Sequence, residues 1–426
     1  MVNGYSERWL RQGFPWVYPA EVTGGRGAPG EVVRIRAPGG ASLGVGIADD
    51  GWIAVRRLRS DDGPVDRALL AARVDAALAL RRVVVPAATT AWRLLHGEND
   101  GLPGIRVDVW GAPPPRADVQ GRPIGEGGPA PHLAITLDSP SLAVLLLDLL
   151  PVLAERLAPA SVHLGWRPDP REPRERVWPE RLLGRVVPRP GCIAGTPPAA
   201  PLVVVEAGAR FLVEPGAVVG RAGGDQVASR DGGLFADMRD NRAWLAPYWA
   251  GTEVLNLYAY TGAFSVAAAR GGASRVVSVD LSAAYLARIG ENLALNGLDP
   301  QVLVEDDVFR ALDRLRRTGE RFDRVILDPP GHSHSEGGAF SVEQDYVRLV
   351  AATLRVVRPG GWLIAASNLG SLSPKAHTGA LIDGARKVGV SLRVIHEGTQ
   401  APDFPAALDF PEARYLKVLV VEVAPT

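Results

Sequence analysis

Acidic residues end three predicted strands in the second half of the sequence. Asp280 closes the segment RVVSVD, Asp307 follows QVLVED, and Asp328 follows FDRVIL and precedes two prolines. The carboxyl ends of parallel strands share one edge of a sheet, and open α/β sheets bind their ligands at that edge. Carboxylates there can accept hydrogen bonds from the hydroxyls of a ribose or the amino group of a base. We therefore expect a nucleoside site at this edge.

A strand predicted over 254–260 leads through Thr261 and Gly262 into a helix beginning at Ala263. Glycine lets the backbone approach a ligand closely, and the first turn of a helix offers free N–H groups. The turn lacks the G-x-G-x-x-G pattern of dinucleotide sites, and the chain has no G-x-x-x-x-G-K-[ST] loop for ATP. A ligand with a ribose and no phosphate fits better, which indicates S-adenosylmethionine.

Asp280 and Asp307 are each predicted to bind one part of this cofactor. Asp280 would bind both ribose hydroxyls, Asp307 the adenine amino group, and the N–H of Val308 a ring nitrogen. Asp307 could also be an ordinary helix N-cap, because aspartate is favoured there. Both interpretations can hold together.

The segment Asp328-Pro329-Pro330 is predicted to be the reaction centre. Its prolines fix the backbone after the fourth strand, so the carboxylate and nearby carbonyls are held rigidly. This suits placing an amine or a base ring in line with a sulfonium methyl group, a displacement governed by orientation. The fifth strand ends in Ser367-Asn368, and Asn368 is expected to face the same pocket.

Metal chemistry is not expected. His332 and His334 lie in a glycine-rich polar loop with no third ligand at a suitable spacing, so a solvated loop is favoured. The chain has one cysteine, Cys192, which excludes an internal disulfide and a cysteine metal cluster.

Composition narrows the class of protein. Lys+Arg and Asp+Glu both number 47, which weakens a nucleic-acid interpretation without excluding a local basic patch. The apolar run 142–154 is too short for a membrane span and contains Asp148 and Pro151. The N-terminus lacks a signal-peptide pattern, so we expect a cytoplasmic protein with no membrane contact, either monomer or homodimer.

Three domains are predicted. Residues 1–62 show short glycine-broken strands typical of a small β-barrel, and residues 63–225 read as an α+β middle domain with loop insertions. Residues 226–426 alternate strands and helices, which indicates a parallel, doubly wound sheet. Its strands are expected at 254–260, 275–280, 301–305, 322–327, 361–366, 391–396 and 415–423.

Segment 167–191 holds seven arginines against four acids. It could be a basic finger that touches RNA phosphates, or a solvated, proline-stiffened hairpin. We favour the hairpin because charge runs are usually solvated. We also expect a loop or hairpin tip at 111–131 and a hairpin at 203–213.

At this point the chain resembles the bacterial PUA-domain ribosomal RNA methyltransferases, a family that includes a 23S rRNA cytosine-C5 enzyme and a guanine-N7 relative. The similar segments are RWLRQGFPWVY, RLLHGENDGLPGIRVDVWG, GLFADMRDNR, NLYAYTGAFSVAAARGGA, LDPP and YLK. In GLFADMRDNR, Met238 stands where the family usually has glutamine.

The resemblance implies a PUA-like RNA-binding barrel, a Rossmann-like class I methyltransferase domain, S-adenosylmethionine as cofactor and large-subunit ribosomal RNA as substrate. It also implies that Arg239, Thr261, Gly262, Asp280 and Asp307 line the cofactor site. We further expect Asn256, Tyr258, Phe264 and Val308 to belong to this site.

One departure from the family affects the chemistry. Cytosine-C5 enzymes attack the base with a thiolate that follows the fifth-strand serine, and this chain has Asn368 there. Methylation of a guanine nitrogen is therefore favoured, as in the guanine-N7 branch. An exocyclic amine is less favoured, because Gly331 stands where those enzymes usually carry an aromatic residue. Cytosine-C5 methylation, an RNA-binding factor with an inactive methyltransferase domain, and a small-molecule methyltransferase stay open as alternatives.

Overall fold

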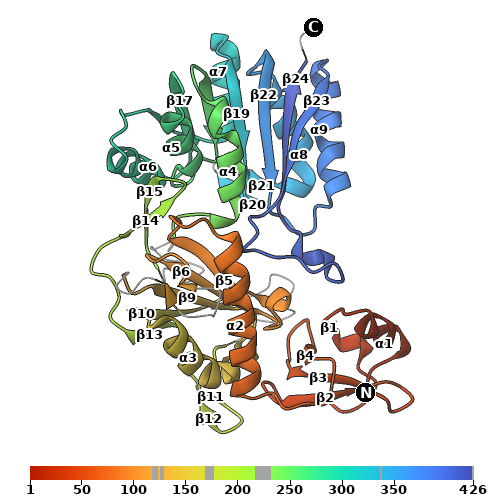
Figure 1. Cartoon of the computed structure of the whole chain (residues 1–426). Coiled ribbons are helices and arrows are strands. Elements are labelled where there is room, and N and C mark those ends of the chain that lie inside the picture. The colour runs from red at the N-terminus through yellow and green to blue at the C-terminus, as the bar shows by residue number, and fades with distance from the viewer. Residues whose placement is uncertain (118–122, 125–128, 168–176, 216–231, 336–337, 425–426) are drawn as a thin grey trace. The chain divides into compact units, whose positions relative to one another are not determined.

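The computed structural model of the chain describes residues 1–117, 123–124, 129–167, 177–215, 232–335 and 338–424 (Figure 1). The chain divides into two compact units. Unit 1 comprises Met1–Glu206, Val213–Gly233 and Pro402–Ala413, and unit 2 comprises Ala207–Leu212, Leu234–Ala401 and Arg414–Thr426.

Unit 1 begins with a four-stranded antiparallel sheet of order β1-β4-β3-β2. Helix α1 (Gly4–Arg11) precedes it and is capped by the Asn3 side chain, which accepts a hydrogen bond from the Ser6 N–H at 2.9 Å. A small core holds Val2, Leu10 and Ile35 together. The strands are β1 (Trp16–Val17), β2 (Val32–Arg36), β3 (Ser42–Ala48) and β4 (Val55–Arg59).

A five-stranded mixed sheet of order β13-β10-β9-β6-β5 follows in unit 1. Helices α2 (Arg67–Val84) and α3 (Ala143–Leu157) pack together, and their apolar residues share one large core with the sheet. The expected α+β arrangement is therefore present. The strands are β5 (Ala91–His96), β6 (Ile105–Trp110), β9 (His132–Leu137), β10 (Ser161–Trp166) and β13 (Gly191–Gly195).

Short hairpins account for other expected segments. The loop at 111–131 contains β7 (Arg116–Ala117) and β8 (Pro123–Ile124), with 118–122 and 125–128 outside the described residues. Within 167–191, residues 168–176 also lie outside them, and β11 (Arg181–Leu182) pairs with β12 (Arg185–Val186). The predicted hairpin at 203–213 forms from β14 (Leu202–Glu206) and β15 (Ala209–Val213).

A segment near the C-terminus completes unit 1. Asp403 is fully buried there, and its carboxylate accepts a 2.9 Å hydrogen bond from the Arg93 N–H. The buried Arg81 donates to the Asp403 carbonyl at 2.9 Å and pairs with Asp100 at 2.5 Å. The ring of Phe404 lies 4.6 Å beneath the Arg93 guanidinium. The segment Pro402–Ala413 is thus an integral part of unit 1.

Unit 2 is built on a seven-stranded sheet of order β18-β17-β16-β19-β22-β24-β23. The predicted strands are all present, but a wholly parallel sheet was wrong, because β24 runs antiparallel to both of its neighbours. In the described residues between β23 and β24, no α-helix carries the chain back to the other end of the sheet, so β24 starts at the edge where β23 ends and runs in the reverse direction. The strands are β16 (Glu253–Leu257), β17 (Arg275–Asp280), β18 (Val302–Glu305), β19 (Phe322–Leu327), β22 (Val357–Ser367), β23 (Leu392–Gly398) and β24 (Lys417–Val423).

Helices cover both faces of this sheet. Residues of α7 (Val308–Thr318), α8 (Val342–Leu354) and α9 (Pro374–Val388) form one core with one face. Residues of α4 (Arg239–Leu245) and α5 (Ala263–Arg270) form a second core with the opposite face. Helix α6 (Ala283–Leu295) contacts α5 and β17. The result is the expected Rossmann-like layered domain.

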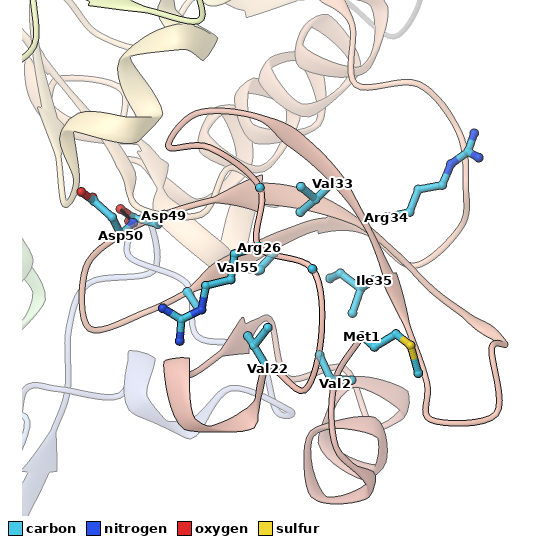
Figure 2. Close-up of a pocket in the computed structure, with 13 residues that line it drawn as sticks. Met1, Val2, Val22, Arg26, Val33, Arg34, Ile35, Asp49, Asp50 and Val55 are labelled. Atoms are coloured by element: carbon cyan, nitrogen blue, oxygen red, sulfur yellow. Dashed lines mark hydrogen bonds between the residues drawn. The ribbon is translucent and has the colours of Figure 1, made fainter.

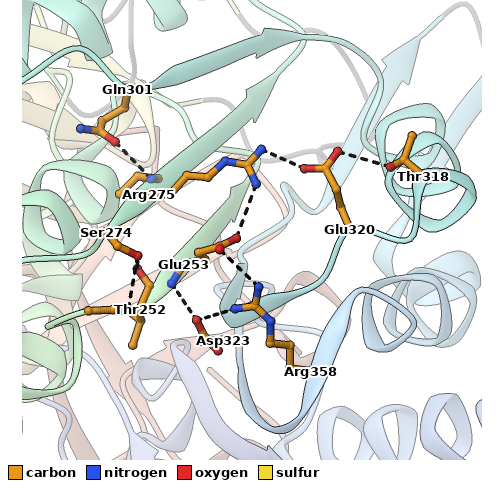
Figure 3. A network of polar contacts seen from close by, with 11 residues as sticks. Thr252, Glu253, Ser274, Arg275, Gln301, Thr318, Glu320, Asp323 and Arg358 are labelled. Carbon is orange, nitrogen blue, oxygen red and sulfur yellow. Dashed lines mark hydrogen bonds and ion pairs between the residues drawn. The ribbon is translucent and has the colours of Figure 1, made fainter.

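An ion-pair network joins the amino ends of the central strands (Figure 3). Arg358 binds Asp323 at 2.7 Å and Glu253 at 3.3 Å. Arg275 binds Glu320 at 2.8 Å and Glu253 at 3.5 Å. The Asp323 carboxylate also accepts a 2.8 Å bond from the Glu253 N–H. Every carboxylate of the network therefore has at least one partner.

Within the described parts of the chain, no helix combines the length and apolar composition that a membrane crossing requires.

Candidate active site

The turn between β16 and α5 has an unusual backbone. Gly262 adopts a φ of +81°, and Tyr258 and Tyr260 have φ values of +56° and +51°. Non-glycine residues rarely adopt this region, and they are held there only when their surroundings impose it. A Cβ added to Gly262 would lie 2.8 Å from Ile289, so only glycine fits this position without movement.

Buried polar contacts support the turn from inside the domain. The amide of Asn256 donates to the Ser265 hydroxyl at 2.9 Å, and that hydroxyl lies 2.8 Å from Ser278. The side chain of Asn292 donates to the Thr261 carbonyl at 2.9 Å. Of the predicted cofactor residues, Asn256 thus lies beneath the turn, with its amide already engaged.

Asp280 lies at the end of β17 beside this turn. One carboxylate oxygen accepts from the Tyr260 N–H at 2.9 Å and the other from the Ser282 N–H at 3.0 Å. The Leu281 N–H also interacts with this carboxylate. Two carboxylate oxygens have about four acceptor sites in total, so the group can still accept a hydrogen bond from a hydroxyl. Burial raises the pKa of Asp280, and the backbone hydrogen bonds oppose that rise.

Asp307 caps helix α7, as the alternative interpretation anticipated. Its Oδ1 accepts from the N–H groups of Phe309 at 2.9 Å and Arg310 at 3.2 Å. In the described residues its Oδ2 forms no hydrogen bond, so a capping role leaves this oxygen for an amino group. Val308 is buried directly after it.

Two further predicted residues lie on the opposite side of the sheet's edge. Arg239 begins α4, is 2 % exposed and lies 3.3 Å from the Asp240 carboxylate. Phe264 is buried beneath the Arg242 guanidinium at 5.6 Å. Phe235 packs against Tyr260 with 5.0 Å between ring centroids, which joins the segment before α4 to the turn.

Asp328 follows β19 at the centre of this edge. Its side chain is partly exposed, and among the described residues it forms no hydrogen bond. Burial, followed by the nearby charge of Asp237, raises the pKa of Asp328 to about 7, and Arg242 opposes the rise. The carboxyl therefore stands ready to accept a hydrogen bond or a proton from an incoming group. Pro329 is buried and Pro330 is exposed.

A neutral aromatic pair lies close to Asp328. Tyr346 and His377 are both buried, and the Tyr346 hydroxyl lies 3.0 Å from His377 Nε2. Burial, and then the charge of Lys417, lowers the pKa of His377 to about 4, so this ring is neutral at pH 7. Burial and the Asp328 charge raise the pKa of Tyr346.

The end of β22 completes the edge. Ser367 is buried and accepts a 3.3 Å hydrogen bond from the Leu369 N–H, whereas Asn368 is exposed. Asn368, the first residue after β22, therefore has a solvent-accessible side chain.

The histidines and the cysteine considered in the sequence as possible metal ligands or nucleophile belong to other strands. His332 and His334 belong to β20 (His332–Ser335), which pairs with β21 (Gly338–Ser341). Cys192 is exposed on β13 of unit 1. Among the described residues, no three His, Cys, Asp or Glu side chains group in a way that could hold a metal ion.

These groups fit S-adenosylmethionine. Asp280 retains acceptor capacity for a ribose hydroxyl, Asp307 retains an oxygen for the adenine amino group, and the positive φ of Gly262 shapes the turn that leads into α5. In comparison with known sequences, residues 193–421 match the family described as S-adenosylmethionine-dependent methyltransferase, and residues 2–60 match the PUA-like domain.

The chain belongs to this methyltransferase family.

Named relatives extend over nearly all of this methyltransferase. The ribosomal RNA large subunit methyltransferase I of Shewanella amazonensis is 30 % identical over 98 % of this chain and 97 % of its own. The ribosomal RNA large subunit methyltransferase of Deinococcus radiodurans is 31 % identical over 99 % and 96 %. A crystal structure described as a methyltransferase complexed with SAH superimposes with a TM-score of 0.81 at 20 % identity over 99 % of both chains. The resemblance and the cofactor prediction are thereby confirmed.

Sequence reasoning assigned no role to several groups near Asp328 in this methyltransferase. They are Asp237, Arg242, Tyr415 and Lys417. The only signal was their position in the segments GLFADMRDNR and YLK, which matched the family without indicating a function.

The PUA-like domain of the methyltransferase has a hollow of about 170 Å³ (Figure 2). Val22, Val33 and Ile35 contribute apolar walls. Arg26 and Arg34 also line it, and both side chains are exposed. Asp49 and Asp50 line it as well, so the lining combines apolar walls with both cations and carboxylates.

Proposed function

We propose that this enzyme methylates a guanine nitrogen of 23S ribosomal RNA. The RNA substrate is suggested by the relatives, which are named ribosomal RNA large subunit methyltransferases. The choice of atom rests on one observation, which is that Asn368 follows Ser367 at the carboxyl end of β22, the strand next to β19, which Asp328 follows. The single cysteine of the chain lies on β13 of unit 1, whereas the edge belongs to unit 2.

The chemistry follows from the atoms at this edge. S-adenosylmethionine supplies an electrophilic methyl group, and a guanine nitrogen attacks such a group with its own lone pair, so no enzyme nucleophile is required. Asp280, Asp307 and Gly262 hold the donor. Asp328 accepts a hydrogen bond from the N–H groups of the base, and the Asn368 amide donates to its oxygen or ring nitrogen. If the attacked nitrogen carries a proton, Asp328 is placed to receive it.

Cytosine-C5 methylation remains the alternative within the family. Carbon 5 becomes nucleophilic only after a thiolate adds to the ring, and Asn368 cannot supply one. For this reason we rank it second.

The remaining domains are proposed to bind RNA. We assign residues 1–62 to RNA recognition, 63–225 to substrate binding and 226–426 to catalysis. On α1, Tyr5 is 62 % and Trp9 41 % exposed, with Arg8 exposed between them. Aromatic rings next to cations stack on unpaired bases and attract phosphates.

Other parts of the proposal follow from an RNA substrate. The base would enter flipped out or unpaired, because a base stacked inside an RNA double helix cannot reach the carboxyl edge of the protein's sheet. We propose a cytoplasmic location and leave the oligomeric state as monomer or homodimer. The arginine-rich 167–191 segment is proposed to be a solvated hairpin.

Mass spectrometry of nucleosides from the rRNA of a deletion strain tests the proposal. We expect one methylguanosine to disappear and to return when the wild-type gene is restored. Loss of 5-methylcytidine would instead establish the cytosine alternative. Unchanged rRNA, together with methylation of a small metabolite by the purified enzyme, would rule out an RNA substrate.

Isothermal titration with S-adenosylmethionine provides the control for an inactive domain. Binding is expected in the wild type and should weaken when Asp280 is replaced by alanine. A wild-type protein that fails to bind the donor would contradict the proposal.

A further inference from the structure

The segment YLK lies at the catalytic edge although it is distant in sequence from Asp328. β24 runs antiparallel to β22, with Lys417 paired to Ser367. The first residue of β24 therefore lies next to the last residue of β22, and Tyr415 precedes it by two positions. Each side chain donates a hydrogen bond to a segment that flanks Asp328.

Tyr415 holds the first flanking segment. Its hydroxyl donates to the Asp237 carboxylate at 2.6 Å. Asp237 is 8 % exposed and lies in the helical turn Ala236–Met238, and its carbonyl accepts a 2.9 Å bond from the Ala401 N–H. This turn directly precedes Arg239 and carries the negative charge that acts on Asp328.

Lys417 holds the second flanking segment. Its ammonium donates to the Leu369 carbonyl at 2.7 Å, one residue beyond Asn368. Lys417 is 7 % exposed, and among the described residues it has no carboxylate partner. Burying an ammonium without an ion pair is costly, so its fixed position beside a backbone carbonyl calls for an explanation other than stability.

We propose that Tyr415 and Lys417 are positioning residues for methyl transfer. By anchoring the Asp237 turn and the Asn368 turn on either side of Asp328, they set the width of the slot that receives the target base. The inference rests on the proposed function only in requiring an RNA base as methyl acceptor, and it holds for whichever base atom is methylated.

The charged and titratable groups around the slot come from every element that forms it. Asp237 and Arg242 belong to the segment before and within α4, and Tyr346 and His377 to α8 and α9. Lys417 belongs to β24. Asp237 and Arg242 influence the Asp328 carboxyl directly, with opposite signs, and Lys417 acts on His377.

The test compares the variants Tyr415→Phe and Lys417→Met with the wild type, using methyl incorporation into rRNA regardless of the base. Each variant removes one hydrogen bond and retains most of the side-chain volume. We expect kcat to fall about 10- to 100-fold because alignment is lost. The Kd for S-adenosylmethionine should stay within about twofold, since neither side chain is in the proposed cofactor set.

Tyr248→Phe and Lys387→Met are the matched controls. Both residues belong to unit 2, Tyr248 is 40 % exposed, and Lys387 is exposed at the end of α9. These variants should retain wild-type kcat. If Lys417→Met does not fold, as thermal melting would show, Tyr415→Phe alone decides the outcome.

A pH profile separates positioning from a merely structural role. Asp237→Asn keeps an oxygen that accepts from Tyr415 but removes the negative charge beside Asp328. The acid limb of the kcat profile should therefore move to lower pH. A kcat that is unchanged in both Tyr415→Phe and Lys417→Met would overturn the inference. Failure of the wild type to methylate rRNA would instead refute the proposed function.

Discussion

The two edges of the seven-stranded sheet differ in how their charges are satisfied. At the amino edge, Glu253, Glu320 and Asp323 are each paired with Arg275 or Arg358 (Figure 3). At the carboxyl edge, Asp328 forms no hydrogen bond with the described residues, and two tyrosines hold left-handed backbone. Paired charges stabilise a fold, whereas a carboxyl left without a partner is a cost that substrate binding can recover. We therefore propose that the amino edge serves stability and the carboxyl edge serves function.

Replacing Asp328 gives the largest expected effect. Asp328→Ala should lower methyl transfer about 10²- to 10⁴-fold, the usual contribution of a positioned acid–base or orienting group. The donor Kd should change little, because Asp328 is not in the cofactor set. Methyl incorporation and calorimetric titration measure the two quantities. A variant with wild-type activity would contradict a functional role for the carboxyl edge.

We expect ionisation of the Asp328 carboxyl to lower the free energy of unfolding as pH rises. Its folded pKa of about 7 lies above the ordinary value of 3.8, so the unfolded chain releases this proton first. The stability of the wild type should decline between about pH 4 and pH 7. Asp328→Asn removes this dependence and should gain about 1–2 kcal/mol at pH 8, allowing for partial exposure. Denaturant unfolding of the wild type and of Asp328→Asn at pH 5 and pH 8 tests this prediction. If the two proteins differ in unfolding free energy by the same amount at both pH values, the prediction is contradicted.

The cofactor turn is expected to give the next largest effect. Gly262→Ala requires a strained φ and contact with Ile289, so donor affinity should fall about 10-fold or more, with about 1–2 kcal/mol of lost stability. Titration with the donor and thermal melting measure these losses. Gly290→Ala, on α6 where an added Cβ meets nothing, is the control. Wild-type affinity in Gly262→Ala would exclude the turn from the cofactor site.

A substitution at the amino edge should lower the stability of the protein without changing its activity. Arg358→Met removes two ion pairs from a partly exposed site and should cost about 0.5–1 kcal/mol. Activity at a permissive temperature should stay at the wild-type level. A variant that melts normally but loses activity would show that the two edges are not separate in role.

Cys192→Ser should have no effect. The thiol is exposed on β13, and a nitrogen acceptor needs no sulfur nucleophile. Unchanged methyl incorporation would sharpen the comparison by confining the chemistry to the carboxyl edge. Loss of activity, or a covalent RNA adduct on this residue, would contradict it.

Sequence reasoning reached the layered α/β fold and the edge where Asp280, Asp307 and Asp328 meet, because strand ends and helix periodicity are local signals. It missed the reversed direction of β24, since pairing direction depends on which neighbour a strand meets in space. It also could not predict positive φ at Tyr258 and Tyr260, because tyrosine has no intrinsic preference for that region.

Contacts between distant residues account for the rest. Tyr415 and Asp237 are 178 positions apart, and Lys417 and Leu369 are 48 apart. No pattern in one sequence specifies such pairs. The resemblance identified the segments that contain them but gave no information on what the side chains do.

Because Pro402–Ala413 belongs to unit 1, unit 1 cannot finish folding until this late segment has been translated. Asp403 satisfies the Arg93 N–H, and its carbonyl accepts from Arg81, in a unit whose other residues all precede position 234. A nascent chain emerges from its N-terminus, so these early residues must wait while nearly 170 intervening residues are translated. Most of unit 1 leaves the ribosome first, but the unit is completed only after most of unit 2 has been translated. A premature stop before residue 402 would leave the buried Arg81 without one of its acceptors.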